Sequence, residues 1–239
     1  MTDDGRTPVG YRPLMVPTSE TALSTVRVTT ASAAVHVTAA ADVRSVVAEH
    51  AAIAVDRSTA TIDSTSTNVD LRVPEGIDLV IGTASGRVRT TGSVGSVAVV
   101  TTSGSVQIDD AASVDVRTKS GRVTVANSRG EARVISGSGN VEIAHCGTAD
   151  VTTASGRVVL RNVDGTARAH CASGRVDITM AGAHDVEAET VSGRISISLP
   201  AATRALIDTP SAGSVAVSGE HDCVVTARSG SGRVDVSTR

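Results

Sequence analysis

Three places in the sequence put a histidine close to a cysteine, the residue types that most readily bind Zn²⁺. They are His145-Cys146, His170-Cys171 and His221-Asp222-Cys223. The three cysteines occupy different positions of the repeat described below, so they do not form one stacked set of ligands. Cys171 falls at an inward strand position, where a thiol packs as a small apolar group, and the other two fall in turns. We therefore expect no metal and no cofactor.

The acidic residues Asp109, Asp110 and Asp115 could hold a cation or act as an acid and base pair. Aspartate is also favoured in solvated turns, and we interpret the group as a turn. The sequence has no Gly-x-Ser-x-Gly elbow, dinucleotide fingerprint or phosphate loop. We therefore expect no catalytic residues and no enzyme; a polysaccharide-cleaving β-helix is the enzymatic alternative.

A third group of residues is a set of arginines that each follow a Ser-Gly pair. They are Arg87, Arg122, Arg157, Arg175, Arg194 and Arg233, and the equivalent positions elsewhere hold Ser105, Asn140 and Ser214. We call the six arginines the arginine stripe. Guanidinium groups in a row could bind a polyanion or an acidic protein. Alternatively, each arginine shields a turn and donates to its backbone carbonyls.

The Ser-Gly pairs belong to an internal repeat that covers most of the chain. The repeat serines are Ser85, Ser103, Ser120, Ser138, Ser155, Ser173, Ser192, Ser211 and Ser231, which lie 17 to 20 residues apart. Between them, apolar and polar residues alternate in two runs per period, which is typical of two β-strands. Five positions per period are apolar or small, or carry a hydroxyl group, and these should point inward.

The repeat predicts an all-β fold: a single-domain parallel β-solenoid with two strands per rung and a period of about 18 residues. We expect right-handed coiling, with successive rungs stacked in chain order. A left-handed hexapeptide helix would need apolar residues at every sixth position, which the columns lack. The predicted solenoid covers residues 21–239, and residues 1–20 should form an extended or disordered arm.

The composition bears on the partners and the cellular location of this protein. The 239 residues include no Phe or Trp and one Tyr, and the net charge is −3. Surface aromatic rings for stacking bases are therefore missing, and we expect no sequence-specific nucleic-acid binding. No apolar run is long enough for a transmembrane segment, and the N-terminal residues do not resemble a signal peptide. We expect a cytoplasmic protein.

The run Val73-Pro74-Glu75-Gly76, followed by Leu79, Ile81, Thr83 and Ser85-Gly86-Arg87-Val88, resembles a known family. It is a bacterial β-strand repeat family that carries the label "adhesin" and has no established function. The resemblance covers roughly residues 21–239. It implies a β-repeat fold, and it supplies no catalytic residues.

We expect a non-enzymatic structural or interaction protein, a rigid β-solenoid rod that self-associates or scaffolds partners. The alternative is a binding module that holds an acidic partner or polyanion along the arginine stripe. The chain ends in a full repeat strand that contains Val234 and Val236. Because an uncovered strand edge is a template for pairing, a homo-oligomer through this terminal rung is the expected mode of self-association.

Overall fold

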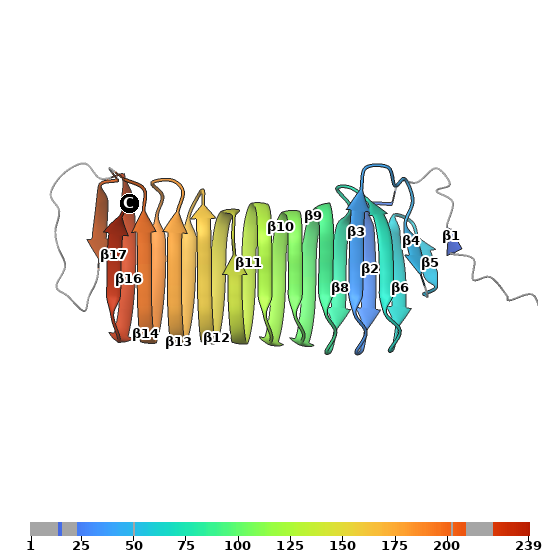
Figure 1. Ribbon diagram of the computed structural model, residues 1–239, viewed down its shortest axis with the longest axis horizontal. Coiled ribbons are helices and arrows are strands. Elements are labelled where there is room, and N and C mark those ends of the chain that lie inside the picture. The colour runs from blue at the N-terminus through green and yellow to red at the C-terminus, as the bar shows by residue number, and fades with distance from the viewer. Residues whose placement is uncertain (1–13, 16–22, 50, 202, 209–221) are drawn as a thin grey trace, which may run out of the picture.

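The structure is a computed structural model, and it describes residues 14–15, 23–49, 51–201, 203–208 and 222–239. All regular elements in these ranges are β-strands, and none of these residues form a helix that could cross a membrane (Figure 1). The strands are β1 Leu14–Met15, β2 Thr25–Thr30, β3 Val35–Ala40, β4 Val47–Glu49, β5 Ile53–Asp56, β6 Thr59–Ser64, β7 Val69–Pro74, β8 Asp78–Thr83, β9 Val88–Ser103, β10 Val106–Ser120, β11 Val123–Ile143, β12 Cys146–Val163, β13 Ala167–Met180, β14 Val186–Leu199, β15 Ala205–Asp208, β16 Cys223–Ser231 and β17 Val234–Thr238.

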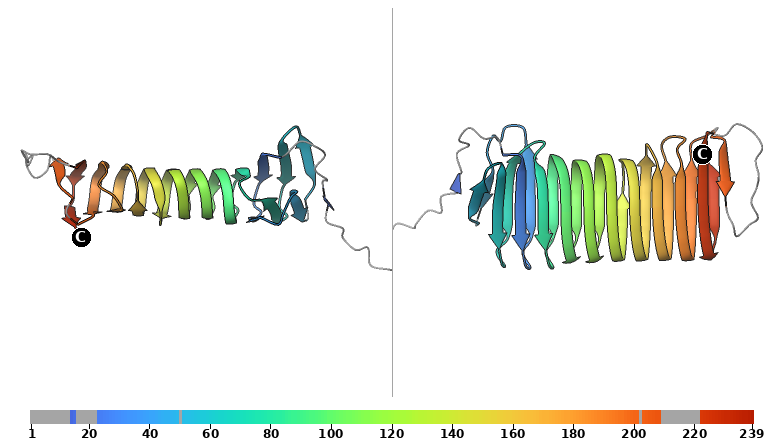
Figure 2. Two further views of the ribbon diagram at one scale, coloured as in Figure 1. Left: turned by 90° about the horizontal axis from the view of Figure 1, so that it is seen from above. Right: turned by 180° about the vertical axis from the view of Figure 1, so that it is seen from behind.

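The chain winds into a flattened coil in which each turn stacks on its neighbour in parallel register (Figures 1 and 2). One row of strands, which includes β2 and β8, forms the first sheet, and the row that includes β3 and β7 forms the second. Longer strands such as β11 continue around a corner from one sheet to the other. Equivalent repeat positions pair directly, for example Val134 with Val151 and Val158 with Val176. The predicted two-strand rung is confirmed.

The interior between the two sheets is built from the predicted columns of Val, Ile, Leu and Ala. Val88, Val106, Val123, Val141, Val158, Val176 and Ile195 are all almost fully buried. The predicted hydroxyl column also faces inward, and some of its members form hydrogen bonds with the Ser-Gly corner. Thr118 Oγ1 donates to the carbonyl of Ser120 at 3.3 Å, and Thr153 Oγ1 to that of Ser155 at 3.2 Å.

A further inward column, which the sequence analysis missed, lines the corner opposite the Ser-Gly pairs. Its buried members are Ala111, Ser128, Cys146, Val163, Met180 and Leu199. Ser128 pairs with Cys146, and Val163 pairs with Met180. Cys146 was expected in a turn, and this was wrong, because it is buried at the start of β12. The strand register shifts beside these pairs, which displaces the alternation on which the expectation rested.

The corner glycines stack directly on one another. A Cβ atom on Gly174 would lie 1.9 Å from the carbonyl oxygen of Gly156, and one on Gly156 would lie 1.9 Å from that of Gly139. Gly139, Gly156 and Gly174 also have positive φ angles of 143°, 133° and 150°. Any side chain here would collide with the neighbouring rung and strain the backbone. Glycine is therefore required at this corner by contact as well as by conformation.

At the N-terminal end, the rungs do not stack in chain order. Strand β2 pairs with β6 on one side and β8 on the other, and β3 lies between β7 and β9. The first rung of the sequence is therefore the second in space, and our expectation of chain order was wrong here. Strands β5 and β4 then pair antiparallel with β6 and β7, and they widen this end of the rod (Figure 2).

The predicted arm over residues 1–20 is described only at Leu14–Met15, which form β1. This short strand pairs antiparallel with β4, opposite Ala48 and Val47. The remainder of the predicted arm lies outside the described residues.

At the C-terminal end, a similar exchange takes place. Strand β16 lies between β14 and β15, because Val225 pairs with Val186 on one side and Ile207 on the other. The last first-sheet strand of the sequence is thus an inner strand, contrary to chain-order stacking. Strands β2 and β3 near one end and β16 near the other therefore each lie between two neighbours, which prevents these strands from being open edges.

The glycine stack makes a prediction about stability. Replacing Gly174 by alanine should lower the free energy of unfolding by about 3 kcal/mol or more, because the new Cβ both collides with Gly156 and strains a positive-φ backbone. For a domain of this size, the melting temperature should fall by about 6–12 °C. Thermal unfolding followed by circular dichroism measures the effect.

Two other glycines provide controls for this experiment. At Gly82, the nearest atom to an added Cβ is the Val28 carbonyl oxygen at 4.0 Å, so Gly82→Ala should change stability by less than about 1 kcal/mol. Gly76 has a φ of 75° but open space around it, so Gly76→Ala isolates the backbone cost, about 1–2 kcal/mol. A Gly174→Ala melting curve that matches that of Gly82→Ala would refute the role of the stack.

Candidate functional site

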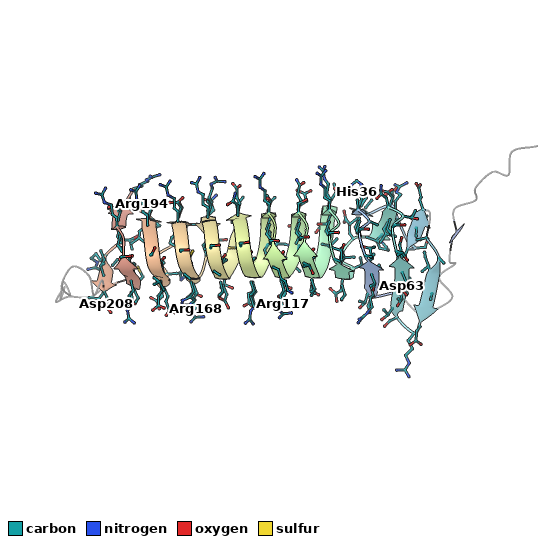
Figure 3. The ribbon with its side chains drawn as sticks, turned by 90° about the horizontal axis from the view of Figure 1, so that it is seen from below. His36, Asp63, Arg117, Arg168, Arg194 and Asp208 are labelled. Atoms are coloured by element: carbon teal, nitrogen blue, oxygen red, sulfur yellow. The ribbon has the colours of Figure 1, made fainter. Side chains whose placement is uncertain are left out.

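The arginine stripe lies on the second sheet, directly after the Ser-Gly corner. Arg157 pairs with Arg175, and Arg175 pairs with Arg194, on successive rungs. Figure 3 shows Arg194 on the same face of the rod as His36, whereas Arg117 and Arg168 project from the opposite face. All six members of the stripe are exposed.

The exchange of strands at the C-terminal end extends this stripe. Strand β17 pairs with β14, with Val234 opposite Ile195, so Arg233 lies on the rung next to Arg194. In the sequence, Ser214 occupies the repeat position between these two arginines, and the repeat therefore predicted an interruption. In the structure, Arg157, Arg175, Arg194 and Arg233 follow one another on consecutive rungs. We call these four residues the arginine run.

Acidic partners for the stripe are scarce. Arg157 forms an ion pair with Asp177, with distances of 2.8 Å from Nη2 and 3.2 Å from Nε to Oδ2. Among the residues that the structure describes, the other five stripe arginines have no ion pair. The Ser-Gly pairs and the residues on either side of them also contain Lys119 but no Asp or Glu, from Ala84 to Arg233. This edge of the rod therefore contains basic and neutral residues but no acidic ones.

The interpretation that the arginines bind corner carbonyls lacks support in the described residues. No stripe guanidinium there donates to a backbone carbonyl. The arginine that does so is Arg129, whose Nη2 lies 3.0 Å from the carbonyl oxygen of Val94 near the opposite corner. The stripe arginines therefore keep their donor groups available to solvent or to a ligand.

The outward face of the first sheet has a different electrostatic character. Its column Asp115, Arg133, Asp150, Arg168 and Glu187 alternates in sign along neighbouring rungs. Arg133 pairs with Asp150 at 3.8 Å and Arg168 with Glu187 at 3.4 Å, while Asp115 turns to Arg117 at 2.9 Å. Exposed pairs contribute only about 0–1 kcal/mol each, but together they neutralise this face.

The histidines and cysteines do not come together. The structure contains no group of three or more His, Cys, Asp or Glu residues with metal-binding geometry in its described ranges. His145 Nε2 lies 3.3 Å from Asp164, and His170 Nδ1 lies 3.3 Å from Glu189. Cys223, expected in a turn, is buried in β16, so that expectation was wrong. His221 lies outside the described residues.

The carboxylates of Asp109, Asp110 and Asp115 each contact a different group of the same chain. The Asn127 side-chain amide donates to Asp110 at 2.5 Å, and Arg129 lies 3.8 Å from the same carboxylate. The backbone N–H of Gly92 donates to Asp109 at 3.4 Å. Asp115 pairs with Arg117. All three aspartates lie within strand β10, which continues through them around the corner, so the interpretation of a turn was wrong.

The predicted self-association edge, Val234 and Val236, lies in β17, and both residues are partly buried. In the described residues, β17 pairs with β14 alone. Residues 209–221, which include the repeat preceding this one, lie outside the described ranges.

The buried thiols make a prediction about reactivity. Burial, and then the negative charge of Asp164, raise the pKa of Cys146 to about 12, and burial is also the main cause of the raised pKa values of Cys171 and Cys223. Because the thiolate is the reactive form, a disulfide exchange reagent at neutral pH should label the native protein slowly. In denaturant, all three cysteines should react.

The same shift gives a sign for the pH dependence of stability. The pKa of the Cys146 thiol is near its ordinary value of 9.0 in the unfolded chain and is raised to about 12 in the folded protein. The thiol's contribution to stability is therefore present below pH 9 and is lost as pH rises toward 12. The control is Cys146→Ser, which copies the paired Ser128 and has no thiol to ionise, so its stability should not show this loss between pH 9 and 12. Rapid labelling of native Cys146 would contradict its burial.

A comparison with protein families identifies the family of this chain. A family model described as Toastrack DUF4097 matches residues 112–239, more than half of the sequence. No curated protein and no solved structure matches the chain. The matched region begins within β10 and continues to the C-terminus, so it includes five of the six stripe arginines. The chain belongs to the Toastrack DUF4097 family, a β-repeat family of unknown function.

Proposed function

We propose that this protein is a non-enzymatic interaction protein, a rigid β-solenoid rod that scaffolds an acidic partner or polyanion along the arginine run. The observation that supports this proposal most directly is the uninterrupted order of Arg157, Arg175, Arg194 and Arg233 on consecutive rungs. One of the four has a carboxylate partner in the described part of the chain.

Neighbouring like charges on a sheet are unfavourable. Adjacent rungs are about 4.8 Å apart, and like charges at such positions repel. The first-sheet face avoids this cost by alternating Asp and Arg, as the Arg133–Asp150 and Arg168–Glu187 pairs show. The arginine run has only the Arg157–Asp177 pair, and a bound anion would relieve its repulsion. This contrast between two faces of one repeat supports a binding role for the run.

The geometry of the run suits an extended ligand. Four rungs span about 14 Å in a straight line, because each step is about 4.8 Å. The glycine stack and the buried columns fix this spacing, so little ordering of the protein is needed on binding. A chain of anionic groups laid along the Ser-Gly edge would meet one guanidinium per rung. Guanidinium groups bind carboxylate, sulfate and phosphate oxygens through paired hydrogen bonds.

The proposal predicts salt-sensitive binding to heparin, used as a probe polyanion. If the four arginines of the run displace counterions from heparin, the affinity should fall roughly 50-fold between about 50 and 200 mM salt. Replacing Arg157, Arg175 and Arg194 by serine should abolish retention on heparin at about 0.15 M ionic strength. The circular dichroism spectrum should remain unchanged, because serine and asparagine already occupy this column at Ser105 and Asn140.

The matched control removes three arginines from the opposite face. Arg117, Arg133 and Arg168 each form an ion pair, and their replacement by serine removes the same formal charge. This variant should retain heparin binding. If both triple variants lose binding equally, retention follows net charge and the run is not the site.

Self-association through the C-terminal end is a second candidate, and it is supported by the hydrogen bonding of β17. Ile195 N–H donates to the carbonyl of Arg233, and Arg239 N–H to that of Leu199. Backbone groups of alternate residues in a parallel strand face opposite neighbours. The backbone groups of Val234 and Val236 therefore point away from β14.

This second candidate predicts that Val236→Pro reduces oligomerisation. Proline removes an N–H donor on the side away from β14 and leaves the β14 pairing intact. Multi-angle light scattering over a concentration series should show wild-type dimers or larger assemblies and a monomeric variant. A wild-type protein that stays monomeric at every concentration would exclude this mode of association.

A further inference from the structure

The N-terminal part of the arginine stripe contains a notch. Val106 of β10 pairs with Val88 on one side and Val123 on the other, so Ser105 lies between Arg87 and Arg122. These two arginines are two rungs apart, about 9.6 Å. Serine at the middle position is short, and the space that an arginine would fill on that rung remains open.

A second row of polar side chains borders the same notch. Gln107 pairs with Arg89, two residues along the strands from Ser105 and Arg87. Together, Arg87, Arg89, Ser105, Gln107 and Arg122 line most of an open depression of about 550 Å³. Three arginines, one glutamine and one serine therefore line the same depression.

The charge of this depression is uncompensated. Its lining contains no carboxylate, and none of Arg87, Arg89 and Arg122 forms an ion pair within the described residues. Many arginines of the following rungs do, including Arg129, Arg133 and Arg161. Three neighbouring cations with neutral hydrogen-bond donors between them favour an anion with more than one charge and several acceptor oxygens.

We propose that this depression binds a compact phosphate group, either inorganic phosphate or the phosphoryl group of a monoester. A phosphate dianion offers at least three acceptor oxygens to the guanidinium, amide and hydroxyl donors. The site spans three rungs, so it accommodates one such group rather than an extended chain. It involves other rungs and another ligand than the arginine run, and it is independent of the function proposed above.

Isothermal titration calorimetry of the full chain tests the proposal, with inorganic phosphate, phosphoserine and acetate as probes. We expect saturable binding of phosphate and none of acetate, which carries one charge. Binding of phosphoserine as well identifies a monoester site, and binding of phosphate alone identifies a site for the free ion. The absence of saturable phosphate binding up to about 10 mM would overturn the proposal.

A pair of variants separates a shaped site from general attraction. Ser105→Arg fills the notch while adding a positive charge, and Asn140→Arg adds the same charge to the same column two rungs away. Both substitutions copy the residue of neighbouring rungs, so both should fold, and their melting curves check this. We expect Ser105→Arg to weaken phosphate binding by at least about tenfold, since the donors lose access to the ligand.

Asn140→Arg should bind phosphate as the wild type does, and Arg87→Ser should lose at least about tenfold because it removes one guanidinium group. Equal or tighter binding by Ser105→Arg would show that the attraction is not specific to the notch, and it would overturn the site. Heparin retention by the arginine run should be unchanged in Ser105→Arg, so the two proposals can fail separately.

Discussion

The contact between stacked corner glycines is the constraint on which the rest of the structure depends. Each of these glycines lies against the carbonyl group of the glycine one rung away, with no room for a Cβ atom. This contact sets the spacing and register of neighbouring rungs at one corner, and the alternation of side chains then decides the rest. Positions two and four after the glycine face the core. The position directly after it faces solvent, and this is where the arginine stripe lies. The glycine stack therefore sets the spacing of the arginines and keeps them in one line along the rod.

The ends of the rod follow a different rule from its middle. In the middle, each rung is followed in space by the next rung of the sequence, and the contacts are regular. At both ends, a strand is inserted between two others; β2, for example, lies between β6 and β8 and pairs directly with each of them. Val28 and Ile81 pair although they are far apart in the sequence. Such contacts are slower to form than those between successive rungs, but they give β2, β3 and β16 neighbours on both sides. An open solenoid end is a hazard for uncontrolled pairing, and this insertion reduces it.

The period and parity of the sequence predicted the rung, the Ser-Gly corner and the buried columns. They did not predict the order of the rungs, because the repeats are nearly equivalent and a local pattern does not say which neighbour a strand selects. That order brings Arg233 next to Arg194. The sequence analysis included both arginines in the stripe, but it placed Ser214 between them. Cys146 was also misplaced, since the register shifts at the second corner change the parity there. The antiparallel strands β4 and β5 carry no repeat motif, and their partners β7 and β6 come later in the chain, so the repeat gave no sign of these pairings.

The arginine stripe is not a requirement of the fold. The same column contains Ser105 and Asn140, and their rungs keep the same parallel register as their neighbours. The core columns and the glycine stack hold these rungs whatever the exposed residue is. Adjacent arginines even work against the fold, because like charges on neighbouring strands repel, whereas the first sheet shows that this repeat can place opposite charges in alternation. A residue type that the fold does not need, and that has an electrostatic cost, is best explained by what the surface binds. The two shorter residues of the same column, Ser105 and Asn140, interrupt this basic edge. Ser105 forms the notch near one end, and Asn140 separates the notch from the arginine run at the other end.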